Sequence, residues 1–160
     1  VYTTLQREAC PLIRLRSHDV VKISTDPCLC GRNSFRFELL GRSDDMFIVK
    51  GVNVFPLGVQ ASLLEHRPQV TGEFFILLDD APPHQNLPRL VIEINDSVEP
   101  DHYDKLNKVL VDAIRLKNNF SANIEFVVRG SIASEHKTRR LYRCYQGMQP
   151  PAYRALFTGL

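Results

Sequence analysis

Two adjacent carboxylates stand out among the residues that could do chemistry. Asp44 and Asp45 lie in the stretch GRSDDMFIVKGVNVFP, which runs from Gly41 to Pro56. Paired carboxylates serve general acid–base catalysis when their surroundings move their pKa values apart. Here a Gly-Arg-Ser sequence precedes the pair and an apolar run beginning at Met46 follows it. This setting favours a solvated turn or a bend in the chain over a catalytic dyad.

The cysteines form a second candidate group. Cys28 and Cys30 are separated by one residue and followed by Gly31, a spacing too tight for a relaxed disulfide but able to supply half of a zinc site. A complete zinc site needs four ligands, and the nearest further candidates in the sequence are Cys10 and His18. We therefore expect free thiols at a tight turn and no metal, with Cys28 and Cys30 as weak metal candidates.

A third group is basic and lies late in the chain, at Lys137, Arg139, Arg140 and Arg143. Such a cluster can meet a phosphate group, although it is also typical of a solvated basic segment. The 160 residues carry a net charge of only +2, without the strongly basic surface of a nucleic-acid-binding protein. No apolar run reaches the roughly 20 residues of a membrane span. We expect a cytoplasmic protein that binds neither nucleic acid nor membrane.

The elements that must position these groups change in character at Gly41. Before it, short apolar runs broken by Pro, Asp and Gly predict strands and hairpins without a helix. After it, we expect a strand over 45–54 that bends at Gly51, followed by a helix from Pro56 to about Arg67. Two strands, TGEFFILL and RLVIEIN, come next. A helix over Asp101–Lys117 and a final strand, ANIEFVV, complete the order. This order is the split βαβ, or ferredoxin-like, arrangement.

Three ordered motifs, TTLQREACPLIRLRSHD, CLCGR and GRSDDMFIVKGVNVFP, together resemble the C-terminal third of the phenylacetate–CoA ligases, a family of acyl-adenylate-forming enzymes. The resemblance runs from Val1 to about Arg143. It implies an α+β fold in which residues 1–43 are the β-rich end of a large N-terminal domain. Residues 44–143 would be a mobile, ferredoxin-like βαββαβ lid domain, and 144–160 an extra tail. The start at Val1 is read as that of a piece cut from a longer protein.

The resemblance also implies a two-step reaction. A carboxylic acid attacks the α-phosphate of Mg-ATP to give an acyl-adenylate and pyrophosphate, and the thiol of coenzyme A then displaces AMP. The implied cofactors are ATP or AMP, Mg²⁺ and coenzyme A, and the implied substrate is an aromatic or aryl-acetic acid. Most of these contacts belong to the N-terminal domain, so that domain is the expected partner and the 160 residues alone are expected to be inactive. An oligomer is compatible with this reading.

Five residues receive roles by matching the family's motifs. Asp19 matches the aspartate that accepts hydrogen bonds from the ribose hydroxyls, and Arg42 matches an arginine near the ribose and phosphate. Asp44 matches the hinge between the domains. Gly51 falls where a missing side chain lets the pantetheine arm pass close to the backbone, although a simple strand bulge remains an alternative. Lys137 matches the lysine that bridges the acid carboxylate and the α-phosphate during adenylation.

Four departures from the family pattern keep a second hypothesis open. His18 and His136 stand where the family has glycine, Gln60 replaces a glutamate, and Ala133 replaces an arginine. The alternative is therefore a non-catalytic accessory or binding module that kept the fold and lost the chemistry. A third reading, an interaction domain that binds nucleic acid through its basic end, is disfavoured by the modest net charge.

Overall fold

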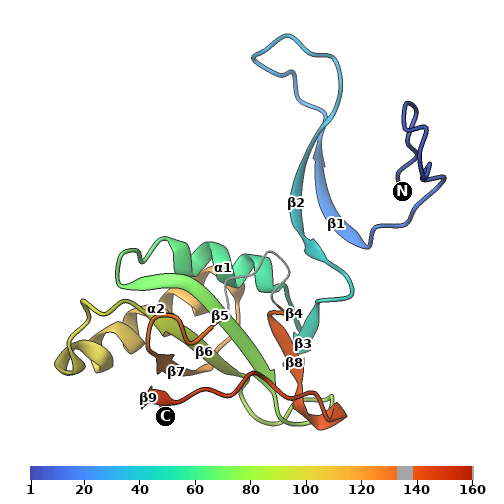
Figure 1. Ribbon diagram of the computed structural model, residues 1–160. Coiled ribbons are helices and arrows are strands. Elements are labelled where there is room, and N and C mark those ends of the chain that lie inside the picture. The colour runs from blue at the N-terminus through green and yellow to red at the C-terminus, as the bar shows by residue number, and fades with distance from the viewer. Residues whose placement is uncertain (133–138, 160) are drawn as a thin grey trace. The chain divides into compact units, whose positions relative to one another are not determined.

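The computed structural model describes residues 1–132 and 139–159 and divides the chain into two compact units, with the boundary between Asp44 and Asp45 (Figure 1). The first unit is built on one antiparallel hairpin, β1 (Asp19–Ser24) and β2 (Arg36–Arg42). It contains no helix, as the sequence predicted. Large apolar side chains of this hairpin, among them Ile23, Phe37 and Leu39, are exposed.

The second unit opens with a short hairpin where the sequence predicted a single bent strand. β3 (Phe47–Val49) pairs antiparallel with β4 (Val52–Val54), and Val49 lies opposite Val52. The two residues between them, Lys50 and Gly51, have φ angles of 48° and 82°. Positive φ at both central positions is the requirement of the two-residue type I′ turn, which reverses the chain. Gly51 is therefore a turn residue, and the prediction of an interior bend was wrong.

The remaining elements follow in the order α1 (Pro56–Leu64), β5 (Val70–Leu78), β6 (Arg89–Ile94), η1 (Pro100–His102), α2 (Tyr103–Asn118), β7 (Asn123–Val127), β8 (Leu141–Arg143), η2 (Cys144–Gln146) and β9 (Ala155–Thr158). Pro56 occupies the first turn of α1, where its missing N–H costs nothing. Asn119 ends α2 in the left-handed conformation, and its N–H bonds the carbonyl of Arg115. The start of α1 and the end of α2 agree with the sequence, whereas α1 ends at Leu64, before the predicted end at about Arg67. None of the described helices is long and apolar enough to cross a membrane.

The five-stranded sheet has the order β8-β5-β6-β7-β9, which differs from the expected ferredoxin-like arrangement. The strand before the first helix, β4, folds back on β3 in a separate two-stranded sheet because of the turn at Lys50 and Gly51. β8 lies beside β5 instead, and β7 runs parallel to β6 through the α2 crossover. The segment expected as an extra tail, 144–160, supplies the edge strand β9. The mixed α/β class holds, whereas the strand order does not.

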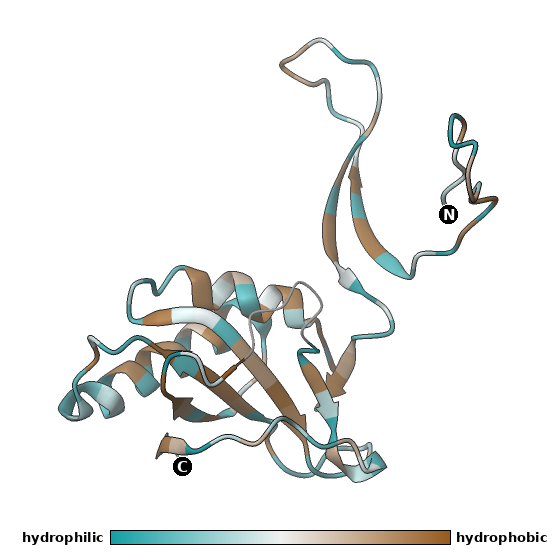
Figure 2. Cartoon of the chain, in the orientation of Figure 1, coloured by the Kyte–Doolittle hydropathy of each residue, from teal (hydrophilic) through white to brown (hydrophobic). Residues whose placement is uncertain are grey.

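The central strands of the sheet are largely hydrophobic (Figure 2), and their apolar side chains are buried on both faces of the sheet. On one face, the helices contribute Val59, Leu63, Leu106, Leu110 and Ile114 to a core with Phe74, Ile76, Leu90 and Ile92 of the sheet. On the other face, Phe75, Leu77, Val91 and Val127 pack with Tyr142 and Ile132, and Cys144, Met148 and Tyr153 lie against them. Burial on both faces explains why β5 has an uninterrupted apolar run over 74–78.

A network around Arg89 fixes the C-terminal segment to this second face. The Arg89 guanidinium makes two bonds to Asp79, of 2.7 and 2.8 Å, and one of 3.2 Å to Glu125. The Tyr153 hydroxyl donates to Glu125 over 2.9 Å. Burial, together with the bond to the Glu125 carboxylate, raises the pKa of Tyr153 to about 12. The tyrosine therefore stays protonated and keeps donating this bond at physiological pH.

Candidate functional site

The first unit brings two sequence-predicted nucleotide-binding residues together. Asp19 and Arg42 are cross-strand partners at the end of the β1–β2 hairpin. Cross-strand neighbours lie about 5 Å apart at their Cα atoms, so one small ligand can meet both side chains. Their carboxylate and guanidinium are complementary to a vicinal diol and a phosphate, respectively.

His18 adopts the backbone conformation that a glycine would favour. Its φ angle is 64°, in the left-handed region, and its carbonyl accepts bonds from the backbone N–H and the hydroxyl of Ser43, over 2.8 and 3.2 Å. Histidine enters this region more readily than most residues. His18 thus has a backbone conformation that the glycine expected from the resemblance would also adopt. This observation weighs against the view that the motif has lost its function.

Arg42 and Asp44 form an ion pair, which joins the predicted nucleotide-binding arginine to the predicted hinge residue. The Arg42 Nε donates to one carboxylate oxygen over 3.0 Å and its Nη2 to the other over 2.6 Å. This hydrogen bonding from Arg42 lowers the pKa of Asp44. Both side chains are about half exposed, so water and salt screen the attraction. A pair of this kind can exchange partners when a phosphate competes for the guanidinium.

The hairpin turn of the second unit borders a cationic pocket. The pocket has a volume of about 280 Å³ and is lined by Val49, Lys50, Val52, Leu87, Arg115, Asn119, Phe120 and Ser121. Two of the lining residues are cations and none is acidic. Sequence reasoning selected Gly51 in the turn but missed Lys50 and Arg115, because only the fold brings α2 against the hairpin. The pocket suits an anionic ligand that passes the turn.

Gly51 itself is required by its backbone conformation and not by crowding. A methyl group built at Gly51 meets no atom within 4 Å, whereas its φ angle of 82° is one that side-chain-bearing residues resist. We expect Gly51→Ala to lower the free energy of unfolding by roughly 1–2 kcal/mol, as a left-handed residue with a Cβ does. Gly51→Asn is the matched control, because asparagine tolerates this region. Urea unfolding measures both variants; an alanine variant as stable as the parent would contradict the reasoning.

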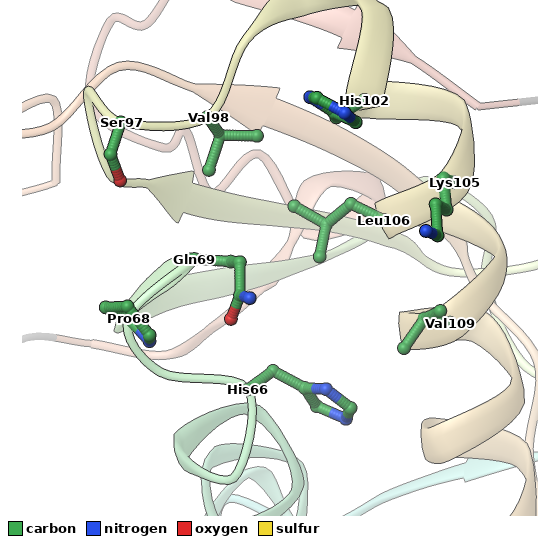
Figure 3. Close-up of a pocket in the computed structure, with 9 residues that line it drawn as sticks. All are labelled: His66, Pro68, Gln69, Ser97, Val98, His102, Lys105, Leu106 and Val109. Carbon is green, nitrogen blue, oxygen red and sulfur yellow. The ribbon is translucent and has the colours of Figure 1, made fainter.

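A larger pocket than the cationic one lies elsewhere in the second unit. It has a volume of about 390 Å³ and sits between the segment after α1 and the start of α2 (Figure 3). Its lining includes His66, Gln69, His102, Lys105 and Leu106. Asp19, Arg42, Asp44 and Gly51, the predicted site residues that the structure describes, are not among its lining residues, so volume alone does not locate the candidate site.

The remaining sequence candidates are the two neighbouring cysteines and Lys137. The Sγ atoms of Cys28 and Cys30 lie 3.0 Å apart, and the hydrogen bond from Cys28 lowers the pKa of Cys30. Within the described ranges, no group of three or more His, Cys, Asp or Glu side chains is placed to hold a metal ion. Lys137, together with His136 and Ala133, lies outside the described residues.

Comparison with known sequences gives one consistent result, although no family model matches the chain. The phenylacetate–coenzyme A ligase of Thermus thermophilus is 43% identical over 79 residues, which are 49% of this chain and 18% of that protein. The enzyme of the same name from Aromatoleum evansii is 30% identical over 128 residues, 78% of this chain and 28% of that protein. The chain spans less than a third of the length of either relative.

Solved structures agree with the sequences. A 2-hydroxyisobutyryl-CoA ligase in the postadenylation state, in complex with R3-HIB-AMP, matches 89% of this chain and 31% of its own with a TM-score of 0.77 and 29% identity. A domain of a phenylacetate–coenzyme A ligase from Bacteroides vulgatus matches 61% of this chain and 91% of its own, with a TM-score of 0.52 and 20% identity, and so shows similarity of fold. Sequence and structure thus identify the chain as a relative of the C-terminal part of the phenylacetate–CoA ligases, among the acyl-adenylate-forming ligases.

Proposed function

We propose that the chain forms the C-terminal part of an ATP-dependent acyl-CoA ligase of the phenylacetate–CoA ligase type. The observation that carries the proposal is the pairing of Asp19 with Arg42 across β1 and β2, in a chain similar over 89% of its length to a CoA ligase bound to an acyl-adenylate. Asp19 binds the ribose hydroxyls, and Arg42 binds the neighbouring phosphate. Lys137, outside the described residues, supplies positive charge to the α-phosphate during adenylation.

The partner of the first unit is the large N-terminal domain of the same enzyme. A two-stranded hairpin is marginally stable alone, and the β1–β2 hairpin exposes Ile23, Phe37 and Leu39 to solvent. These side chains gain hydrophobic free energy only when another surface covers them. The large domain would also hold most of the ATP and the acid, for which the sequence relatives support an aryl-acetic acid.

Mg²⁺ accompanies ATP in this reaction, but the described residues do not fit a site for it. No group of three or more His, Cys, Asp or Glu side chains lies together in that part of the chain. We therefore assign none of these residues to the ion. The chemistry that this chain contributes is charge stabilisation by Arg42 and Lys137, together with the positioning of coenzyme A.

Rotation at the Asp44 hinge takes the enzyme from the first half-reaction to the second. The boundary between the compact units falls directly after Asp44, which supports a rotation there. In the adenylation step the second unit brings Lys137 to the phosphate. After rotation, it presents the turn at Gly51 to the pantetheine arm, and Lys50 and Arg115 in the adjoining pocket bind the phosphates of coenzyme A.

Removing either pocket cation is expected to weaken the binding of coenzyme A. A charge-assisted hydrogen bond contributes about 1.5–3 kcal/mol, so Lys50→Ala or Arg115→Ala should raise the KM for coenzyme A about tenfold or more. Carboxylate-dependent ATP–pyrophosphate exchange should not change, because that half-reaction precedes coenzyme A. Lys108→Ala removes an exposed lysine of α2 that does not line the pocket and serves as the control. An unchanged KM in both pocket variants would remove the pocket from the coenzyme A site.

The proposal as a whole is tested with the complete gene product. Incubation with phenylacetate, ATP and labelled pyrophosphate should produce exchange into ATP, and addition of coenzyme A should release AMP and a thioester. A protein that folds but gives no exchange with any aryl-acetic or aromatic acid would favour the accessory-module alternative. The glycine-like backbone of His18 supports the catalytic reading.

A further inference from the structure

On the side of the first unit, the chain is held up to Ser43. Arg42, the last residue of β2, is the cross-strand partner of Asp19. Ser43 then donates its backbone N–H and its hydroxyl to the carbonyl of His18, over 2.8 and 3.2 Å. These residues all belong to the first unit. The defined backbone of that unit therefore extends one residue beyond β2 and reaches the residue before Asp44.

On the side of the second unit, the chain is held from Met46 onward. The Nη2 of Arg143 donates to the carbonyl oxygen of Met46 over 3.3 Å. Arg143 is half-buried at the end of β8, where it lies opposite Leu78 of β5, so the donor is fixed to the five-stranded sheet (Figure 1). The next residue, Phe47, is only 4% exposed and packs edge-to-face on Phe120, with the ring centres 6.0 Å apart.

The bond from Arg143 connects parts of the second unit that are 97 positions apart in the chain. Met46 directly precedes β3, which forms a two-stranded sheet with β4, whereas Arg143 belongs to the five-stranded sheet. Because a peptide unit is planar, holding the Met46 oxygen also restricts the orientation of the whole peptide between Met46 and Phe47. This bond therefore fixes the start of the small hairpin to the main sheet of the unit.

Two residues, Asp44 and Asp45, lie between these two points of attachment. We propose that Arg143 is a positioning residue for the rotation between the half-reactions, because it holds the Met46 carbonyl to the second unit and so confines the rotation to the backbone of Asp44 and Asp45. The inference rests on the proposed function, which places a rotation at Asp44, and it adds Asp45 to the pivot.

A short pivot has a consequence for the chemistry. A hinge absorbs its rotation in the φ and ψ angles of a few residues, and fewer rotatable residues leave fewer end positions for the unit that moves. A misplacement of about 1 Å at a reacting group can cost about 10²-fold in rate. Arg143 touches no substrate in this role and acts through the Met46 carbonyl.

The first test uses the complete gene product and combines two substitutions. Asp44→Pro restricts one pivot residue and should slow thioester formation from preformed acyl-adenylate and coenzyme A. Arg143→Met keeps an unbranched side chain but removes the donor, so the Met46–Phe47 peptide can turn. In the double variant we expect the thioester step to be about tenfold faster than in Asp44→Pro alone, a partial recovery of the loss. A residue that only stabilises the fold would add its own loss to that of the proline.

Arg154→Met is the matched control, because it removes an exposed arginine of the same C-terminal segment. Combined with Asp44→Pro, it should leave the rate of the proline variant unchanged. Recovery by Arg154→Met equal to that by Arg143→Met would contradict a specific role of Arg143.

The second test does not depend on catalysis. An endoproteinase that cleaves before aspartate cuts at Asp44 and Asp45, and mass spectrometry identifies the fragments. A longer rotatable segment fits a protease more readily, so cleavage at these two sites should be at least about threefold faster in Arg143→Met. Cleavage before Asp112, which is exposed on α2, should not change and serves as the internal reference.

The two tests separate failure of the inference from failure of the proposed function. A double variant no faster than Asp44→Pro, unchanged cleavage at Asp44 and Asp45 in Arg143→Met, or an equal increase at Asp112 would overturn the inference. If Asp44→Pro alone leaves the thioester step intact, the proposed hinge fails. If the complete gene product forms no thioester with any acid, the proposed function fails. In both of these cases the cleavage rates still decide whether Arg143 holds Met46.

Discussion

Replacing Lys137 by alanine in the complete gene product is expected to lower carboxylate-dependent ATP–pyrophosphate exchange by about 10²- to 10³-fold, the loss typical when one preorganised charge-stabilising donor is removed. Negative charge develops on the transferring phosphate as the acid attacks it. An ammonium placed at this point stabilises the transition state more than the ground state, so its removal lowers the rate of adenylation. Isotope exchange into ATP with phenylacetate as the acid measures the effect.

Two controls separate this role from a general loss of positive charge. Arg139→Ala removes a neighbouring cation of the same basic segment and should leave exchange near the parent rate. In Lys137→Ala itself, the thioester should still form normally from preformed acyl-adenylate and coenzyme A. Normal exchange in Lys137→Ala would remove the lysine from catalysis, and a thioester step slowed to the same extent would assign it a structural role instead.

The parts of the fold that were predictable are those with strong local signals. Pro56 placed the start of α1 correctly, and the helical spacing of apolar residues placed α2 within two residues of its observed ends. The continuous apolar run at Phe74 predicted the buried strand β5. In each case the local preference and the tertiary packing agree, so the sequence alone was sufficient.

The strand order could not be predicted, because it depends on features without a local signal. The Lys50-Gly51 turn needs positive φ at a lysine, and only Asn-Gly or Asp-Gly pairs announce such a turn clearly. β8 has only three residues, and its extended conformation is defined by its parallel pairing with β5. β9 is likewise defined by its antiparallel pairing with β7.

The candidate site was predictable only where a motif carries it. Asp19 and Arg42 were selected by resemblance, but their register across a hairpin with a long connection was not readable from the sequence. Lys50 and Arg115 are 65 positions apart, and only the packing of α2 near the β3–β4 turn places both on one pocket. Glu93, a charged residue within the RLVIEIN strand, is buried, which its type alone does not predict. Each of these features depends on contacts between residues that are distant in the sequence, and local periodicity carries no information about such contacts.

The second large effect is expected at the hinge. Asp44→Pro should slow thioester formation from the acyl-adenylate about 100-fold, since a rotation that stops short leaves the reacting groups misplaced. Proline fixes φ near −65° and also restricts the preceding residue, Ser43. ATP–pyrophosphate exchange should continue, because Asp44 does not have a positive φ in the observed conformation and adenylation needs no rotation.

Asp44→Ala distinguishes the backbone from the carboxylate. Both substitutions abolish the ion pair with Arg42, but only proline restricts the rotation. We therefore expect the alanine variant to carry out both half-reactions, and rapid-quench measurement of each step compares the two directly. If alanine slows the thioester step as much as proline does, the exchange of Arg42 between Asp44 and a phosphate controls the rotation. If neither substitution slows it, the pivot lies at another residue, even though the chain divides into its two compact units directly after Asp44.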